Sequence, residues 1–299
     1  MQNYNSYRSF LKKKFGKPVL KIPINGGFSC PNRDGTKSSE GCLFCDNRSF
    51  SPAAENNRSP VNQLKSKLEH ASKFSFVIPY LQPFSNTYGS LEMLKSVYEP
   101  LLGIKKVVGI AIGTRPDCFT DQIFDYLEDL AKRTYLSIEL GLQSSHDKTL
   151  SAINRGHSFE DFCRTVDKLH KRGIETVAHV ILGLPGENED MMIQTAKKLS
   201  SLPVDGIKIH QLMIIKGTAL ENLFKNGNIE TFDLLVYTKI LCEFIEYLRP
   251  EQHIHRLMAD SHPDFGLVAP LWSSEKSASV LFIHDYMKVN GIEQGSAFR

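Results

Sequence analysis

The feature that most constrains the fold is a short apolar segment that recurs along the chain, after a longer first gap at intervals of roughly 30 residues, with amphipathic stretches between the segments. These segments are rich in Val, Ile, Phe and Tyr and are nearly continuously apolar, which is typical of strands buried on both faces. Because a strand, a helix and the next parallel strand together need about 30 residues, the spacing predicts six βα units. The predicted strands are residues 19–24, 74–82, 107–113, 135–142, 176–182 and 207–214.

Six such units favour an α/β fold in which a parallel sheet curls into a partial (βα)6 TIM-like barrel. The C-terminal ends of the strands are then expected to carry the functional site. We assign residues 1–249 to the barrel and place a long cysteine-containing loop at 25–59, after the first strand. Residues 250–299 break the rhythm, and we expect a C-terminal extension packed on the barrel. The clearest predicted helices are residues 61–72, 159–171, 191–199 and 232–248.

Composition excludes several classes of protein. Hydrophobic residues make up 41% of the chain and charged residues 23%, values that exclude intrinsic disorder. The formal net charge of +3 is compatible with a nucleic-acid substrate without demanding one. No apolar run reaches the roughly 18–20 residues that span a bilayer, and the N-terminal segment lacks the apolar core of a secretion signal. We therefore expect a cytoplasmic protein with no membrane partner.

Three of the six cysteines, Cys30, Cys42 and Cys45, lie close together in a loop rich in Gly, Pro, Asn and Asp. Thiolates in such a loop bind zinc or an iron–sulfur cluster. The alternative is that these cysteines are only small buried residues, but a loop of this composition cannot bury much. Structural zinc usually takes two close pairs of ligands, and this loop has one. A [4Fe-4S] cluster normally takes four thiolates, so three favour a cluster with one iron open. S-adenosylmethionine (SAM) would chelate that iron through its amino and carboxylate groups.

With the phrases CPNRDGT, TRPDC, ELGLQS, NRGH and HVILGLPGE at predicted strand ends, the sequence resembles the radical SAM superfamily. The wide Cys-x11-Cys-x2-Cys spacing departs from the commonest short spacing of that superfamily. Within the superfamily, the sequence is similar to the branch related to the Elongator catalytic subunit. Within that branch it resembles the small bacterial YhcC/YtqA (MnmL) type. The resemblance implies a [4Fe-4S] cluster on the three cysteines, and SAM that is cleaved to methionine and a 5′-deoxyadenosyl radical. It also implies a reductant such as flavodoxin or ferredoxin.

The resemblance and the strand ends together give a set of SAM-binding candidates. They are Gln82, Asn86, Thr87, Thr114, Arg115, Asp117, Glu139, Gln143 and Arg155. Each has a plainer alternative. The loop with Gln82 could be only a polar loop, and it lacks the Gly-Gly-Glu form common in the superfamily. Asp117 could cap the helix expected near Phe119, and Arg155 could be a surface loop residue.

Glu139 lies in an otherwise apolar strand, where a carboxylate is costly unless it is paired. Bound SAM offers an ammonium and ribose hydroxyls, so Glu139 and Gln143 are the best ligand candidates on this strand. An internal ion pair of Glu139 with Arg115 or Arg155 is the alternative. Arg155 could itself pair with the methionyl carboxylate, because a guanidinium suits that geometry.

His179, Lys208 and His210 are expected to face the barrel interior and to form a substrate pocket as the catalytic residues. A lone strand histidine is more often a satisfied core residue. A buried lysine without a partner would be strained, and an anionic substrate group would supply that partner. Among the basic runs, Lys12–Lys14 is the expected contact for phosphate.

For the substrate, the resemblance implies a wobble uridine of tRNA. The expected task is removal of the carboxymethyl part of carboxymethylaminomethyl-(2-thio)uridine, which leaves the aminomethyl form. Two alternatives stay open at this point. One is a radical SAM enzyme that acts on a protein or a small metabolite. The other is a non-catalytic zinc or iron–sulfur module. The sequence assigns no oligomeric state.

Overall fold

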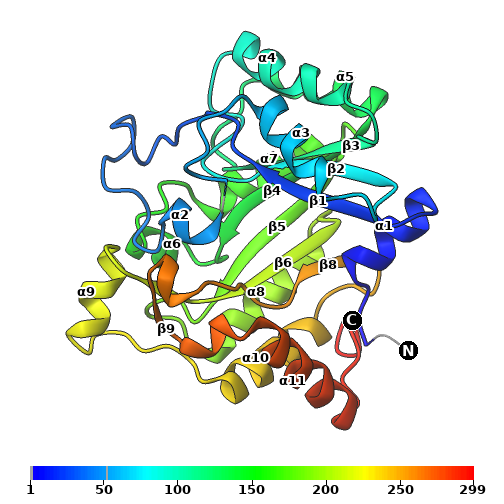
Figure 1. Ribbon diagram of the computed structural model, residues 1–299. Helices are drawn as coiled ribbons and strands as arrows, with labels where there is room; N and C mark the ends of the chain where they lie inside the picture. The colour runs from blue at the N-terminus through cyan, green and yellow to red at the C-terminus, as the bar shows by residue number, and fades with distance from the viewer. Residues whose placement is uncertain (1–2, 52) are drawn as a thin grey trace.

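A sheet of seven parallel strands forms the centre of the computed structural model, which describes residues 3–51 and 53–299 (Figure 1). The order of the strands in the sheet follows their order in the chain, so each crossover leads to the neighbouring strand, as in a barrel. The strands are β1 (Val19–Ile24), β2 (Phe76–Leu81), β3 (Gly109–Thr114), β4 (Tyr135–Gln143), β5 (Glu175–Leu182), β6 (Gly206–Gln211) and β8 (His253–Arg256).

Six of these strands correspond to the predicted segments, and the α/β partial-barrel fold is confirmed. The predicted count of six strands is wrong, because β8 pairs in parallel with β6 and adds a seventh strand from the region that we expected to be an extension. The sequence of β8, HIHR, contains a single apolar residue. A search for apolar runs misses such a strand when its inward face is polar.

Helices cover the outer face of the curled sheet and form the main hydrophobic core with it (Figure 1). Leu94 of α4, Phe162 of α7 and Tyr237 of α10 are among the fully buried side chains of this core. The helices are α1 (Tyr7–Phe15), α2 (Asn47–Phe50), α3 (Pro60–Glu69), α4 (Leu91–Leu102), α5 (Asp121–Arg133), α6 (Asp147–Ala152), α7 (Phe159–His170), α8 (Glu189–Ser201), α9 (Ala219–Lys225), α10 (Leu234–Glu246) and α11 (Lys276–Val289).

Local signals set where these helices begin. Ser158 and Asp161 form a reciprocal capping box at the start of α7, and Ser59 caps α3 just before a proline. The side chain of Thr120 caps α5, whose first residue is Asp121. The alternative of Asp117 as the cap is therefore wrong, since Asp117 lies too early in the chain to reach the first free N–H groups of α5.

Helix α1 closes the sheet at the N-terminal ends of the strands. Its residues Tyr7 and Leu11 pack against Ile78 and Tyr80 of β2 on the inner face. The basic run Lys12–Lys14 forms the last turn of α1. The Lys14 ammonium lies 5.1 Å from the centre of the Tyr135 ring at the start of β4. This run therefore lies at the end of the sheet opposite the C-terminal strand ends.

The C-terminal part of the chain packs along one side of the sheet. It contains a two-stranded antiparallel sheet of β7 (Ile214–Ile215) and β9 (Leu267–Ala269), and two short 3-10 helices, Pro263–Phe265 and Leu271–Ser274. The side chain of Gln211 donates to the Ala259 carbonyl and to the Ser273 hydroxyl, which fastens this part to β6. Among the described residues, no helix has the length and apolar character needed to cross a membrane.

Candidate active site

One cavity opens at the C-terminal ends of the strands and encloses about 1010 Å³ of space, part of it open to solvent. The predicted site residues that line it are Cys30, Cys42, Cys45, Gln82, Thr114, Arg115, Glu139, Gln143, Arg155, His179, Lys208 and His210. The curled sheet thus brings together side chains from the cysteine loop and from five strands or the loops that follow them.

The cysteine loop presents three free thiols to the cavity. Cys42 is buried, while Cys30 and Cys45 are partly exposed, and a backbone hydrogen bond of 2.9 Å joins the Cys45 N–H to the Cys42 carbonyl. Two donors approach the Cys42 sulfur: Arg155 Nη1 at 3.4 Å and Asn32 Nδ2 at 3.6 Å. These two donors hold the Cys42 sulfur in place at the cavity.

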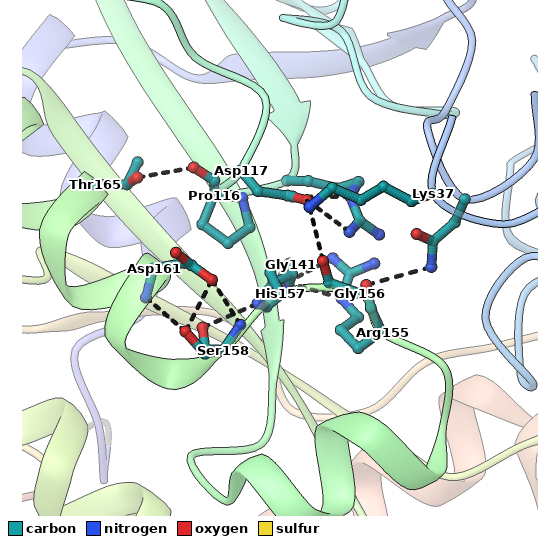
Figure 2. A network of polar contacts seen from close by, with 12 residues as sticks. Lys37, Pro116, Asp117, Gly141, Arg155, Gly156, His157, Ser158, Asp161 and Thr165 are labelled. Carbon is teal, nitrogen blue, oxygen red and sulfur yellow. Dashed lines mark hydrogen bonds and ion pairs between the residues drawn. The ribbon is translucent and has the colours of Figure 1, made fainter. Parts of the chain in front are cut away.

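Long-range contacts hold this loop against the segment that follows α6 (Figure 2). The Lys37 ammonium bonds Asp117 at 2.5 Å and the Gly156 carbonyl at 2.8 Å. The side chain of Asn154 donates to the Gly41 carbonyl at 2.7 Å. These contacts place the loop at the mouth of the cavity, although Pro52, within the predicted loop 25–59, lies outside the described residues.

Arg115 has a free donor at this cavity. Its guanidinium forms two hydrogen bonds of 2.9 Å with Asp117, yet its Nη1 atom is buried and has no hydrogen-bond partner. A buried, unpaired N–H is costly, and a carboxylate would satisfy it. Together with the three thiols, this donor fits a bound iron–sulfur cluster and the methionyl carboxylate of SAM.

Strand β4 is distorted where it enters the site. Its pairing with β5 shifts register between Gly141 and Gln143, and Gln143 has a φ of 82°, a conformation uncommon for a residue with a side chain. A Cβ on Gly141 would lie 2.4 Å from Arg155 Nη2, so any larger residue there would displace this arginine, which bonds the Gly141 carbonyl at 2.5 Å. Arg155 is buried, and the alternative of a surface loop arginine is wrong.

Three predicted SAM-binding residues, Asn86, Thr87 and Asp117, are not among the described residues that line the cavity. The Asn86 amide donates to three backbone carbonyls at 2.8–3.0 Å, and the Thr87 hydroxyl lies 2.6 Å from the Thr114 hydroxyl. Asp117 binds Arg115 and Lys37. These side chains hold the loops after β2 and β3 in place around the residues that do line the cavity.

Glu139 is the centre of a polar cluster on the inner face of the sheet. Its side chain is fully buried and forms ion pairs with Lys21 of β1 and with Lys208 of β6, the latter at 3.0 Å. His179 Nε2 lies 2.7 Å from the same carboxylate. Inward-facing residues of three other strands therefore share the Glu139 carboxylate, which offsets the cost of burying it.

Two expectations about this cluster are wrong. The closest ion-pair partners of Glu139 are lysines, not Arg115 or Arg155, because both arginines lie nearer the mouth and bond other groups. Lys208 is not without a partner, since it bonds Glu139 and, at 3.1 Å, the Tyr80 hydroxyl. Both partners come from other strands that face the same interior.

Burial controls protonation in this cluster. It lowers the pKa of Lys208, and burial together with the Lys208 charge lowers the pKa of Lys21 well below its usual value. Burial, followed by the nearby positive charges, also lowers the pKa values of His179 and His210 well below the usual range. Both imidazoles are therefore neutral near pH 7, and His179 can donate its Nε2–H to Glu139.

Lys21, Tyr80 and Arg256 are site residues that the sequence analysis did not select. Lys21 contacts Glu139, whereas Tyr80 and Arg256 line the cavity. Successive strand residues face opposite sides, so a lysine in the apolar strand VLKIPI carried a usable signal. The sequence offered no such signal for Arg256, because its strand, β8, was not predicted.

Replacing Glu139 with alanine is expected to lower the free energy of unfolding by about 3–5 kcal/mol at pH 7, because Lys21 and Lys208 lose their buried carboxylate. Burial has lowered the pKa of both lysines, so the folded variant binds fewer protons than its unfolded chain. Its stability should then rise relative to wild type between pH 7 and pH 10. Urea unfolding at several pH values measures this, with Glu160→Ala, in an exposed ion pair, as the control. A loss below 1 kcal/mol would contradict the assigned role.

Comparison with known families and relatives shows which protein family the chain is similar to. Residues 30–199 match the sequence model of the Radical SAM superfamily, and residues 204–289 match that of the Radical_SAM C-terminal domain. The chain is 38% identical over 302 residues to YtqA of Bacillus subtilis, covering 100% of this chain and 94% of that protein. It is 36% identical over 294 residues to YhcC of Escherichia coli, covering 98% and 94%.

More distant relatives share part of the sequence or the fold. Elongator complex protein 3 of Saccharomyces cerevisiae is 29% identical over 160 residues, which are 52% of this chain and 28% of that protein. Among solved structures, the archaeal Elp3 of Methanocaldococcus infernus superposes with a TM-score of 0.68 at 16% identity, over 92% of this chain and 64% of that chain. At that identity the likeness shows a common fold.

Proposed function

Because the chain belongs to the radical SAM superfamily and is similar to YtqA, YhcC and Elongator complex protein 3, we propose that it is a radical SAM enzyme that modifies the wobble uridine of tRNA. The cofactors of the superfamily, a [4Fe-4S] cluster and SAM, together supply a 5′-deoxyadenosyl radical that removes a hydrogen atom from an unactivated C–H bond. The protein excludes water and positions the substrate.

We assign the cofactors to the mouth of the cavity. Cys30, Cys42 and Cys45 hold the cluster, and the free N–H of Arg115 binds the methionyl carboxylate. The other SAM contacts in this proposal are the remaining candidates that line the cavity, namely Gln82, Thr114, Glu139, Gln143 and Arg155. Asn86, Thr87 and Asp117 act through the loops that they hold. A reductant such as flavodoxin or ferredoxin delivers the electrons in the cytoplasm.

The observation that carries the proposal is that the cysteine loop and the deeper residues His179, Lys208 and His210 line the same cavity. A substrate atom between them would lie close to both the radical source and the polar groups. A wobble base can enter such a cavity only when it is swung out of the anticodon loop. The proposed substrate is carboxymethylaminomethyl-(2-thio)uridine, and the product is its aminomethyl form.

The proposed route begins at the glycine-like methylene of the substrate, R–NH–CH2–COO⁻. Loss of a hydrogen atom to the deoxyadenosyl radical, then of one electron to oxidised flavodoxin or ferredoxin and of one proton, forms the imine R–N=CH–COO⁻. Water hydrolyses the imine to R–NH2 and glyoxylate. In this proposal the proton passes to water or to a neutral imidazole of the cavity, His179 or His210.

The test is the modified-nucleoside profile of tRNA from a strain that lacks the gene. Carboxymethylaminomethyl-uridine species should accumulate, while the aminomethyl and methylaminomethyl forms fall to near zero, and a plasmid copy of the gene should restore them. A wild-type profile under several growth conditions would exclude this substrate. The radical chemistry would then have to act on a protein or a small metabolite.

A further inference from the structure

The inner face of the sheet carries more buried positive than negative charge. Lys21, Lys208 and Arg256 lie there with side chains that are 18%, 10% and 24% exposed, and the two lysines pair with Glu139. The Arg256 guanidinium lies 4.0 Å from Asp260, which is 40% exposed. Three cations of the cluster therefore share two carboxylates, the buried Glu139 and the largely buried Glu175, and burial raises the pKa of Glu175 to about 7, so a surplus of positive charge remains near pH 7. Such a surplus is costly unless an anion binds beside it.

Arg256 is the cation of this cluster with the most unused donors. Its Nε atom is buried and has no hydrogen-bond partner, and its Nη2 atom lies 3.0 and 3.1 Å from the two ring nitrogens of His210. A guanidinium has five N–H donors, so most of those of Arg256 are available. Arg256 and Lys208 both line the cavity, and the Lys208 ammonium donates hydrogen bonds to Glu139 and Tyr80.

We infer that Arg256, with the charge of Lys208 beside it, is the carboxylate-binding subsite of this cavity. The guanidinium takes both oxygens of a carboxylate that is attached to an amine, and this identity of the ligand rests on the proposed function. The product of the proposed reaction has lost the carboxylate, so the subsite holds the substrate and releases the product. The N-terminal part of the chain then holds the cofactors, and strand β8 recognises the substrate.

Binding of a small probe to the cluster-loaded, full-length protein tests this without tRNA. N-methylglycine is expected to bind with a Kd of about 1–10 mM by titration calorimetry or ligand-observed NMR, which is ordinary for so small a ligand. Dimethylamine, which lacks the carboxylate, and inorganic phosphate, the other anion that a nucleic acid offers, should each bind at least ten times more weakly.

Arg256→Gln should weaken binding of N-methylglycine at least tenfold, and Arg256→Lys should restore part of it. Arg133→Gln, a change in an exposed ion pair, should leave the Kd unchanged. Circular dichroism and cluster absorbance verify that each variant is folded. If Arg256→Gln does not fold, the Kd of Arg256→Lys is the measurement that tests the subsite. An unchanged Kd in the Arg256 variants, absent binding to wild type, or equal binding of phosphate would each overturn the subsite. A deletion strain with a normal tRNA profile would instead overturn only the tRNA substrate.

Discussion

Alanine at Cys30, Cys42 or Cys45 is expected to abolish the iron–sulfur cluster and with it all activity. Anaerobically purified wild type should be brown and hold about four irons per chain. Each single variant should lose the colour and nearly all of the iron, because the three thiols line one cavity mouth and two ligands do not retain the cluster. Iron analysis and visible absorbance after anaerobic reconstitution measure the outcome.

The control for this experiment is Cys163→Ala. Cys163 lies on α7, outside the residues that line the cavity, and should keep the full iron content. Wild type that stays colourless and binds zinc after reconstitution would contradict the cluster assignment and support the non-catalytic zinc module. Loss of iron in Cys163→Ala as well would mean that the variants fail to fold.

Lys208→Ala is expected to reproduce the deletion profile, with carboxymethylaminomethyl-uridine accumulating in tRNA while the cluster is retained. Lys208 lines the cavity in which the substrate carboxylate is proposed to bind, and loss of a charge-assisted contact of about 2 kcal/mol corresponds to about a 30-fold loss in kcat/KM. Glu139 keeps its contacts with Lys21 and His179 in this variant, so the fold should survive.

The nucleoside profile of a complemented deletion strain and the iron content of the purified variant together measure this prediction. Lys216→Ala is the matched control, since Lys216 is exposed and lies just beyond β7. A wild-type nucleoside profile with Lys208→Ala would remove this lysine from substrate binding. Loss of iron would instead assign it a role in holding the site together.

The cluster loop and the six apolar strands were predictable because each depends on residues that are near one another in the chain. A strand buried on both faces is apolar along its whole length, and three cysteines within one polar loop indicate metal chemistry whatever the rest of the fold does. The exception is β8, which faces a polar interior and carries two histidines and an arginine. Its apolar content is too low for periodicity to detect.

The sequence predicted which residues belong to the candidate site better than it predicted which of them contact one another. Most selected residues line the cavity because they lie at strand ends or on inward positions of strands, which a period of two identifies. The pairing of Glu139 was assigned to arginines, and Lys208 was expected to lack a partner. Each residue was judged within its own segment, and the pairing partner of each lies on another strand.

By itself, the sequence determined the parallel α/β architecture through local composition and spacing, and the superfamily through the resemblance of its motifs, while the assignment of the three cysteines as cluster ligands stays a prediction. Only the tertiary structure decided which charges meet. Lys21, Glu139, Lys208 and Arg256 come from four different strands of the sheet, β1, β4, β6 and β8. They share one interior because the sheet curls until its two edges face each other, and curvature is set by strand twist and by the packing of α1 and the outer helices.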